Sequence, residues 1–145
     1  MPSMPTRRTR TTSLLAVTIV AASMLSGCHS ANTAAAPACR PAHAPQYPTT
    51  DAALADADAG GTWCVKVGDT VAVTLHVPFA ESATGWKPIT PSDTSVLEPV
   101  SNGVVSLVRG VTATFLAVRK PGVVTIASTR PNGATWNATV VARAK

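Results

Sequence analysis

The chain has 145 residues, of which 46% are hydrophobic and 13% charged, and this length suits about one domain. Its net charge is +5, but three of its twelve basic residues lie within the first ten positions, in a segment that we interpret as a removable leader. The rest of the chain carries nine basic and seven acidic residues, so its composition gives little support to nucleic-acid binding. No apolar run reaches the ~20 residues that a membrane-spanning helix needs.

Residues 1–27 have the organisation of a lipoprotein signal peptide. Arg7, Arg8 and Arg10 are followed by an apolar core at 14–24, which is too short to cross a membrane. The sequence Leu25-Ser26-Gly27-Cys28 then resembles the bacterial lipobox. We expect cleavage before Cys28, lipidation of its thiol, and anchoring of the exported chain to the outer face of a bacterial membrane. The alternative is an ordinary cleaved signal with a chance cysteine.

Residues 28–61 are predicted to be the lipidated cysteine and a disordered tether. Of the 33 residues at 29–61, twelve are Ala and four are Pro, and they follow neither a strand period nor a helix period. We interpret the aspartates at 51, 56 and 58 as part of this solvated linker. A calcium loop starting at Asp56 would need a glutamate where Val67 stands, so no metal site is expected there.

Two cysteines remain if Cys28 carries lipid. Cys39 and Cys64 form an even pair in an exported and oxidising setting, which favours a disulfide between them. Such a bridge would pin the end of the tether to the first strand and stabilise the fold by roughly 3–3.5 kcal/mol. The alternatives are a buried free thiol at Cys64 and an unpaired Cys39.

Residues 62–145 are predicted to form an all-β, immunoglobulin-like antiparallel sandwich of about seven strands. Val and Thr make up 28 of these 84 residues, and β-branched side chains favour strands. Apolar residues alternate with others at 63–67, 71–77, 111–118, 124–126 and 136–142. The dipeptides Asn102-Gly103, Pro121-Gly122 and Asn132-Gly133 predict turns, with a positive φ expected at the glycine of Pro121-Gly122. Trp63 and Trp136 are expected in the core, and a small β-barrel is the alternative fold.

The predicted β domain has no recognisable catalytic pattern. His76 is its only histidine, and we interpret it as a solvated strand residue, which leaves no Ser-His-Asp or Cys-His set. The acidic residues are dispersed among turns, and neither a phosphate-binding loop nor a metal-ligand spacing is present. We therefore expect no enzyme activity, cofactor or metal, and regard the loops as the candidate binding surface.

Val77 to Val141 resembles the chagasin-type inhibitors of papain-like cysteine proteases. Ser95-Val96-Leu97 and the segment 115–126 match framework patterns of that family. Thr84-Gly85-Trp86 matches the end of its first loop, in which an Asn-Pro-Thr-Thr-Gly-aromatic pattern is usual. Arg130-Pro131 matches the start of its third loop, with an asparagine in place of the aromatic that usually follows. The family's glycine-rich middle loop has no convincing counterpart.

The resemblance implies an immunoglobulin-like domain whose loops enter a protease cleft without covalent chemistry. Thr84, Gly85, Trp86, Arg130 and Pro131 would then contact a papain-like cysteine protease. For Trp86 a place in the core is an alternative, and for Arg130 a solvated strand end. The strand pattern also occurs in generic bacterial immunoglobulin-like modules, so the alternative function is a structural or adhesive envelope lipoprotein without inhibitory activity.

Overall fold

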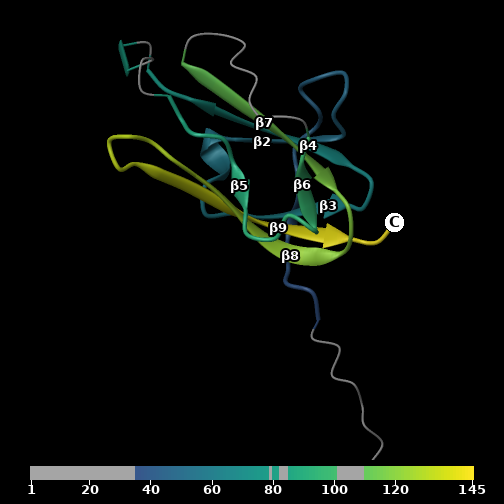
Figure 1. The fold of residues 1–145 in the computed structure, drawn as a ribbon. Helices are drawn as coiled ribbons and strands as arrows, with labels where there is room; N and C mark the ends of the chain where they lie inside the picture. The colour runs from purple at the N-terminus through teal and green to yellow at the C-terminus, as the bar shows by residue number, and fades with distance from the viewer. Residues whose placement is uncertain (1–34, 79, 82–84, 101–109) are drawn as a thin grey trace, which may run out of the picture. The chain divides into compact units, whose positions relative to one another are not determined.

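The computed structural model describes residues 35–78, 80–81, 85–100 and 110–145 (Figure 1). The predicted signal peptide, Cys28, Thr84 and the Asn102-Gly103 turn lie outside the described residues. The described residues belong to one unit, Ala34–Lys145. Within them, no helix is long and apolar enough to cross a membrane.

Two sheets make up this unit. The first contains, in spatial order, β1 (Arg40–Pro41), β3 (Thr62–Lys66), β9 (Thr135–Arg143), β8 (Gly122–Thr129) and β5 (Thr90–Pro91). The second contains β2 (Ala52–Ala55), β4 (Thr70–His76), β7 (Val111–Val118) and β6 (Leu97–Pro99), and a short 3-10 turn, η1 (Asp56–Asp58), follows β2. The prediction of an all-β, immunoglobulin-like sandwich is confirmed, with nine strands among the described residues.

Not all of the strand pairs are antiparallel. The pairs β1–β3, β3–β9 and β2–β4 are parallel, whereas β4–β7, β6–β7, β5–β8 and β8–β9 are antiparallel. The first four strands alternate between the two sheets, so β1 and β3, and likewise β2 and β4, are not joined by a hairpin. A crossover of this kind permits parallel pairing, which a tight turn does not.

The structure places residues 40–61 in the sandwich rather than in a tether. Ala52, Ala53 and Leu54 of β2 are all buried. One edge of β2 pairs with β4, and the other is bridged by His43, whose backbone N–H and C=O both bond to Ala53. A strand that is buried on both faces needs no alternation with polar residues, so Ala52 to Leu54 have no sequence period.

The core lies between the two sheets and includes both Trp63 and Trp136, as expected. Other fully buried core side chains are Leu54, Val71, Val73, Leu75, Leu97, Leu116, Val124, Ile126 and Val140. Thr74 is also buried, although it faces away from this core, because Tyr47 lies beside it with the hydroxyl groups 3.4 Å apart. Tyr47 also packs edge-on against Phe115, with ring centroids 5.4 Å apart. The chain before β2 thus covers the outer face of the second sheet.

Glycine has a different role at Pro121-Gly122 than expected. Gly122 has no positive φ and begins β8. A Cβ at this position would lie 2.9 Å from Cγ2 of Val96, so glycine permits the close approach of these two segments. At Asn132-Gly133, by contrast, Gly133 has φ +86°, which the predicted turn requires.

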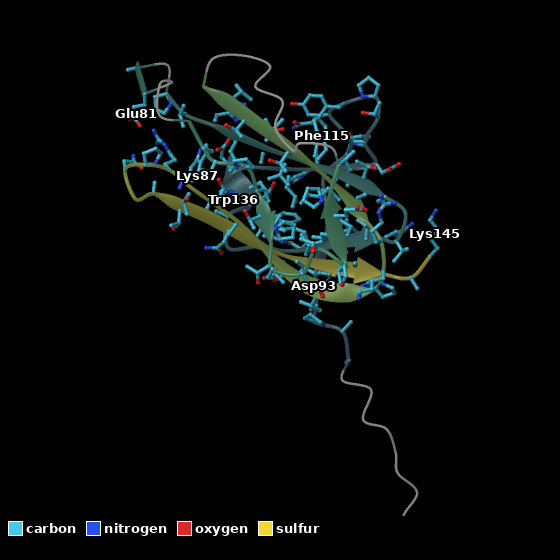
Figure 2. The ribbon with its side chains drawn as sticks, in the orientation of Figure 1. Glu81, Lys87, Asp93, Phe115, Trp136 and Lys145 are labelled. Carbon is cyan, nitrogen blue, oxygen red and sulfur yellow. A yellow bond between two sulfur atoms is a disulfide. The ribbon has the colours of Figure 1, made fainter. Side chains whose placement is uncertain are left out.

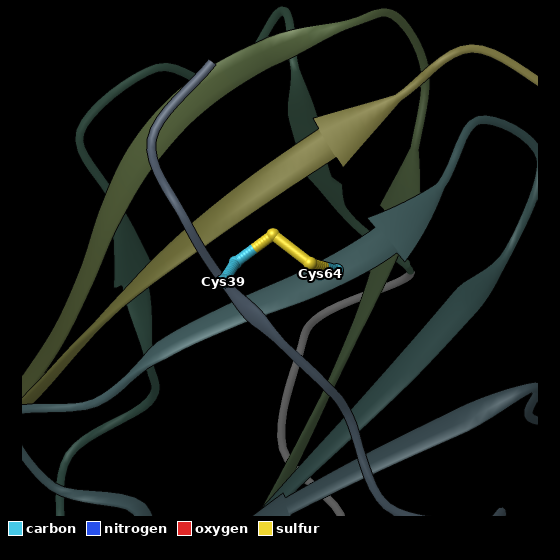
Figure 3. The surroundings of a disulfide bond; sticks show 2 residues. All are labelled: Cys39 and Cys64. Carbon is cyan, nitrogen blue, oxygen red and sulfur yellow. A yellow bond between two sulfur atoms is a disulfide. The ribbon is translucent and has the colours of Figure 1, made fainter. Parts of the chain in front are cut away.

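A disulfide joins Cys39 to Cys64, with their Cα atoms 5.3 Å apart (Figure 3). Cys64 lies on β3 between Trp63 and Val65, whose side chains are buried in the core. Side chains alternate along a strand, so the bridge lies on the outer face of the first sheet. It holds the start of β1 against β3.

Replacing both bridged cysteines by serine should lower the free energy of unfolding by about 3.5 kcal/mol, because the bridge spans a sequence separation of 25 residues. Urea unfolding of the chain from residue 29 onward measures this loss. An unchanged unfolding midpoint would show that the bridge does not restrain the unfolded chain.

Candidate functional site at the loop-bearing end of the sandwich

The segments that carry the expected contact residues meet at one end of the sandwich. β4 ends and β7 begins at this end, and β8 turns into β9 there. The loop end is defined by the described residues of 77–89 together with 130–134. Glu81 lies at this end of the molecule and Lys145 at the other (Figure 2). Of the five residues expected to contact a partner, the described ones are Gly85, Trp86, Arg130 and Pro131.

Trp86 is half-buried and packs against the core cluster. Its indole Nε1 donates a hydrogen bond to the carbonyl O of His76 at 3.0 Å. Its own carbonyl O accepts one from the hydroxyl of Thr112 at 3.1 Å. The side chain is therefore attached to the end of β4 and the backbone to β7, with part of the ring left at the surface.

Arg130 closes the turn between β8 and β9. Its N–H donates to Ala134 at 2.9 Å, and its carbonyl accepts from Gly133 at 3.0 Å. Its side chain is 9% exposed, and Nη2 donates to the carboxylate of Glu81. The guanidinium carbon lies 5.8 Å from the ring centroid of Trp86. The side chain thus turns back onto the loop end instead of extending into solvent.

The two segments of the loop end are also joined through their backbones. Lys87 N–H donates to the carbonyl O of Thr129 at 3.0 Å, and the hydroxyl of Ser128 donates to the carbonyl O of Lys87 at 2.6 Å. Pro131 and Asn132 lie beyond these bonds and are exposed. The hydrogen bonds of Lys87 to Ser128 and Thr129 therefore fix the position of the 130–134 turn relative to Trp86.

Gly85 has space around it. Among the described residues, the nearest atom to a Cβ built there is Oγ1 of Thr112 at 3.7 Å, an ordinary contact distance. At Gly61, by comparison, a Cβ would lie 2.5 Å from Nε1 of Trp63. The packing of the described residues therefore explains a glycine at position 61 but not at position 85.

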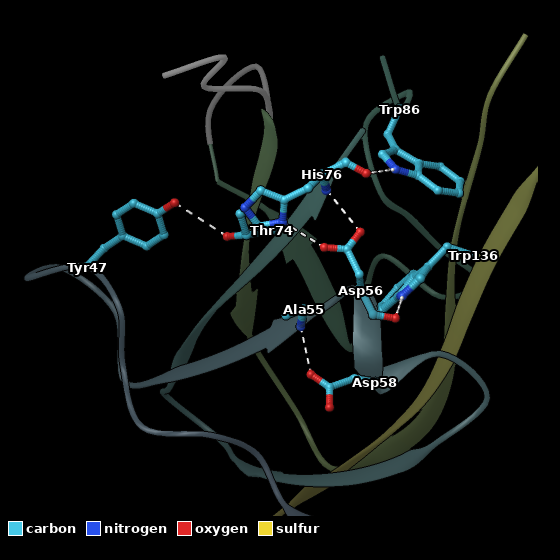
Figure 4. A network of polar contacts seen from close by, with 8 residues as sticks. All are labelled: Tyr47, Ala55, Asp56, Asp58, Thr74, His76, Trp86 and Trp136. Carbon is cyan, nitrogen blue, oxygen red and sulfur yellow. Dashed lines mark hydrogen bonds and ion pairs between the residues drawn. The ribbon is translucent and has the colours of Figure 1, made fainter. Parts of the chain in front are cut away.

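The turn η1 holds the end of β4 next to the loop end, although it lies within residues 28–61, which the sequence predicts to be a tether (Figure 4). The Asp56 carboxylate accepts hydrogen bonds from the backbone N–H of His76 at 2.9 Å and from its Nδ1 at 2.7 Å. The carbonyl O of Asp56 accepts from Nε1 of Trp136 at 3.3 Å. Because Trp86 bonds to the carbonyl of this same His76, Asp56 sets the point to which Trp86 is attached.

Asp58, the other acidic residue of η1, is buried with 4% of its surface exposed. Its carboxylate accepts from the backbone N–H of Ala55 at 2.7 Å and from Nε2 of His43 at 2.8 Å. Its carbonyl O accepts from Nε1 of Trp63 at 3.3 Å. A signal of this role was present in the sequence, because Gly61 lies between Asp58 and Trp63 and leaves room for the hydrogen bond that joins them.

The polar contacts of the loop end and of η1 have structural roles. Both His–Asp pairs, His43–Asp58 and His76–Asp56, hold η1 in place. Among the described residues, no group of three or more His, Cys, Asp and Glu side chains could hold a metal ion. The loop end offers a half-buried aromatic ring and an exposed turn on a rigid base, which is how a sandwich presents a recognition surface.

A cavity of about 580 Å³ lies away from the loop end, beside the disulfide. Its lining includes the ends of β3 and β9 together with Asp51 and Asp69. The carboxylates of these two residues accept hydrogen bonds from the backbone N–H groups of Thr70 and Lys66. Both carboxylates therefore already have a structural role near the start of β4.

No family model and no curated protein sequence matches the chain. Among solved structures, it is similar to the cysteine protease inhibitor EhICP2 from Entamoeba histolytica, with a TM-score of 0.51 and 16% identity over 63% of this chain and 93% of that one. Amebosin matches with a TM-score of 0.43 and 13% identity, over 63% of this chain and 96% of its own. PbICP-C, solved in complex with falcipain-2, matches with a TM-score of 0.41 and 11% identity, over 64% of this chain and 98% of its own. The similarity to EhICP2 shows that this chain has a chagasin-like fold.

Asp56→Ala should displace Trp86, because it removes both side-chain hydrogen bonds that hold His76. We expect the Trp86 indole N–H signal to shift in a two-dimensional NMR spectrum, with a stability loss of about 1–3 kcal/mol. Asp51→Ala is the matched control, because that carboxylate holds Thr70 N–H at the other end of β4. An unmoved Trp86 signal in Asp56→Ala would contradict the described linkage.

Proposed function

We propose that this chain is an inhibitor whose loop end enters the active-site cleft of a papain-like cysteine protease. The observation that carries the proposal is the loop end itself, where Trp86 and the 130–134 turn are held together by bonds within the chain. The chagasin-like fold that the chain shares with the inhibitor EhICP2 supports it. So do Thr84-Gly85-Trp86 and Arg130-Pro131, which match the loop patterns of that family.

Inhibition would proceed by occlusion. A wedge that fills the cleft excludes substrate and water, so it needs no nucleophile, metal or cofactor of its own. Ordering a flexible side chain on binding costs about 0.5–1.5 kcal/mol, and residues already fixed in the free protein avoid that cost. Trp86, bonded to His76 and Thr112 before any partner arrives, is such a residue. Gly85 next to it would let the partner backbone come close.

We propose that the same chain is exported and held on the outer face of a bacterial membrane by lipid on Cys28. The disulfide at Cys39 would then leave ten residues of spacer, 29–38, between the lipid and the domain. The eleven residue steps from Cys28 to Cys39 reach at most about 40 Å when fully extended. The proteases that it meets would therefore be ones that come within that distance of the bilayer.

Titration of papain with the chain from residue 29 onward tests the inhibitory function. We expect inhibition at micromolar protein or below, and we expect Trp86→Ala to weaken it by about 30-fold, the effect of losing a residue worth about 2 kcal/mol. Val123→Ala is the matched control, because Val123 is an exposed apolar side chain on β8. Its inhibition constant should equal that of the unaltered chain.

Two outcomes would count against this function. Absence of inhibition at micromolar protein would favour a structural or adhesive envelope lipoprotein, whose loops do not enter a protease cleft. Inhibition that is equally strong in Trp86→Ala would place the contact surface away from the loop end.

Metabolic labelling with a fatty acid tests the anchor separately. Cys28→Ser should abolish the label, because its thiol is the proposed acceptor. Cys39→Ser should retain it, since Cys39 forms the disulfide in the folded domain. Label that persists in Cys28→Ser would exclude this lipidation site.

A further inference from the structure

We infer that Arg130 is a positioning residue of the loop end, which couples the β8–β9 turn to Glu81 and Trp86 and does not itself contact the partner. The inference rests on the proposed function, but its second test below is independent of any protease. It differs from the role that the sequence suggests for Arg130, which is direct contact with the protease.

Burial is the first reason. The Arg130 side chain is 9% exposed, whereas that of its partner Glu81 is 49% exposed. A guanidinium that binds an acidic group on another protein has to present its N–H groups at the surface. Arg130 instead donates to Glu81, 49 residues earlier in the chain, so contact with a partner would have to break this ion pair.

The second reason is the aromatic contact. The Arg130 guanidinium lies over the ring of Trp86, 5.8 Å from its centroid, within the range of a cation–π interaction. The Trp86 indole N–H is at the same time bonded to His76. The ring is thus held at two points, and one of them is the arginine of the opposite segment.

The third reason is the local backbone at both ends of the ion pair. Arg130 closes the turn that precedes β9 through its N–H and C=O. Glu81 N–H donates to the carbonyl O of Pro78 at 2.8 Å, so this residue also sits in a bonded turn. The pair therefore joins two turns that are each closed on their own, and it fixes the distance between them.

A double-mutant cycle on papain inhibition tests this role. Glu81→Gln should raise the inhibition constant about fivefold, the size expected for a charge pair worth about 1 kcal/mol. Arg130→Gln should raise it at least as much, because it also removes the contact with the Trp86 ring. The double variant should be no weaker than Arg130→Gln alone, because the arginine change already removes the pair with Glu81. Glu98→Gln is the matched control, since Glu98 pairs with Arg119 near the other end of β7, and it should leave inhibition unchanged.

Direct contact between Arg130 and the protease predicts a different pattern. Glu81→Gln would then leave inhibition unchanged or strengthen it, since it releases the guanidinium, and only Arg130→Gln would weaken it. That result would overturn the inference. A general loss of stability is distinguished by urea unfolding, because Glu81→Gln and Glu98→Gln each remove one ion pair and should shift the unfolding midpoint by similar small amounts, whereas only Glu81→Gln weakens inhibition.

Amide hydrogen exchange of the full chain in mild detergent, without protease, gives the second test. The Lys87 and Arg130 amides, which bond to Thr129 and Ala134, should exchange about fivefold faster in Glu81→Gln and at the normal rate in Glu98→Gln. If the unaltered chain fails to inhibit papain, the proposed function fails, but this measurement still decides the coupling. Equal exchange rates in all three proteins would overturn it.

Discussion

The buried indole N–H groups of Trp63 and Trp136 need hydrogen-bond acceptors, and the packing of the two sheets depends on the residues that supply them. A buried donor without an acceptor costs about 1–3 kcal/mol, and both donors lie in a core with few polar groups. The carbonyl oxygens of Asp58 and Asp56 accept them, each at 3.3 Å. Both tryptophans belong to the first sheet, whereas η1 directly continues β2 of the second. These two hydrogen bonds therefore join the two sheets at η1, the turn that also holds His76 at the end of β4.

The same turn links the core to the proposed binding surface. Asp56 holds His76 at the end of β4, and the carbonyl of His76 in turn holds the indole of Trp86. From Trp86 the contacts continue to Arg130 and the β8–β9 turn. A surface built in this way has its shape before a partner arrives, which suits a protein that acts by filling a cleft.

The sequence predicted β3, β4, β7, β8 and β9, because apolar side chains on one face of each strand enter the core and alternate with the other face. It did not predict the short strands β5 and β6. It also failed for β2, which is buried on both faces from Ala52 to Leu54 and so has no period. Gly122 was assigned to a turn because a close approach to Val96 depends on tertiary structure. The inward direction of Arg130 was equally hidden, because its partner Glu81 lies 49 residues away and no local pattern joins them. Local periodicity thus predicts strands, while the contacts that shape the site are long-range.

The most direct measurement of the central claim is a hydrogen-exchange footprint of this chain bound to a catalytically inactive papain-like protease. Binding through the loop end predicts protection of residues 85–88 and 130–134. It predicts none at 66–69 and 119–121, which lie at the opposite end of the sandwich. Protection confined to the outer face of β8 around Val123, or no protection at all, would contradict it.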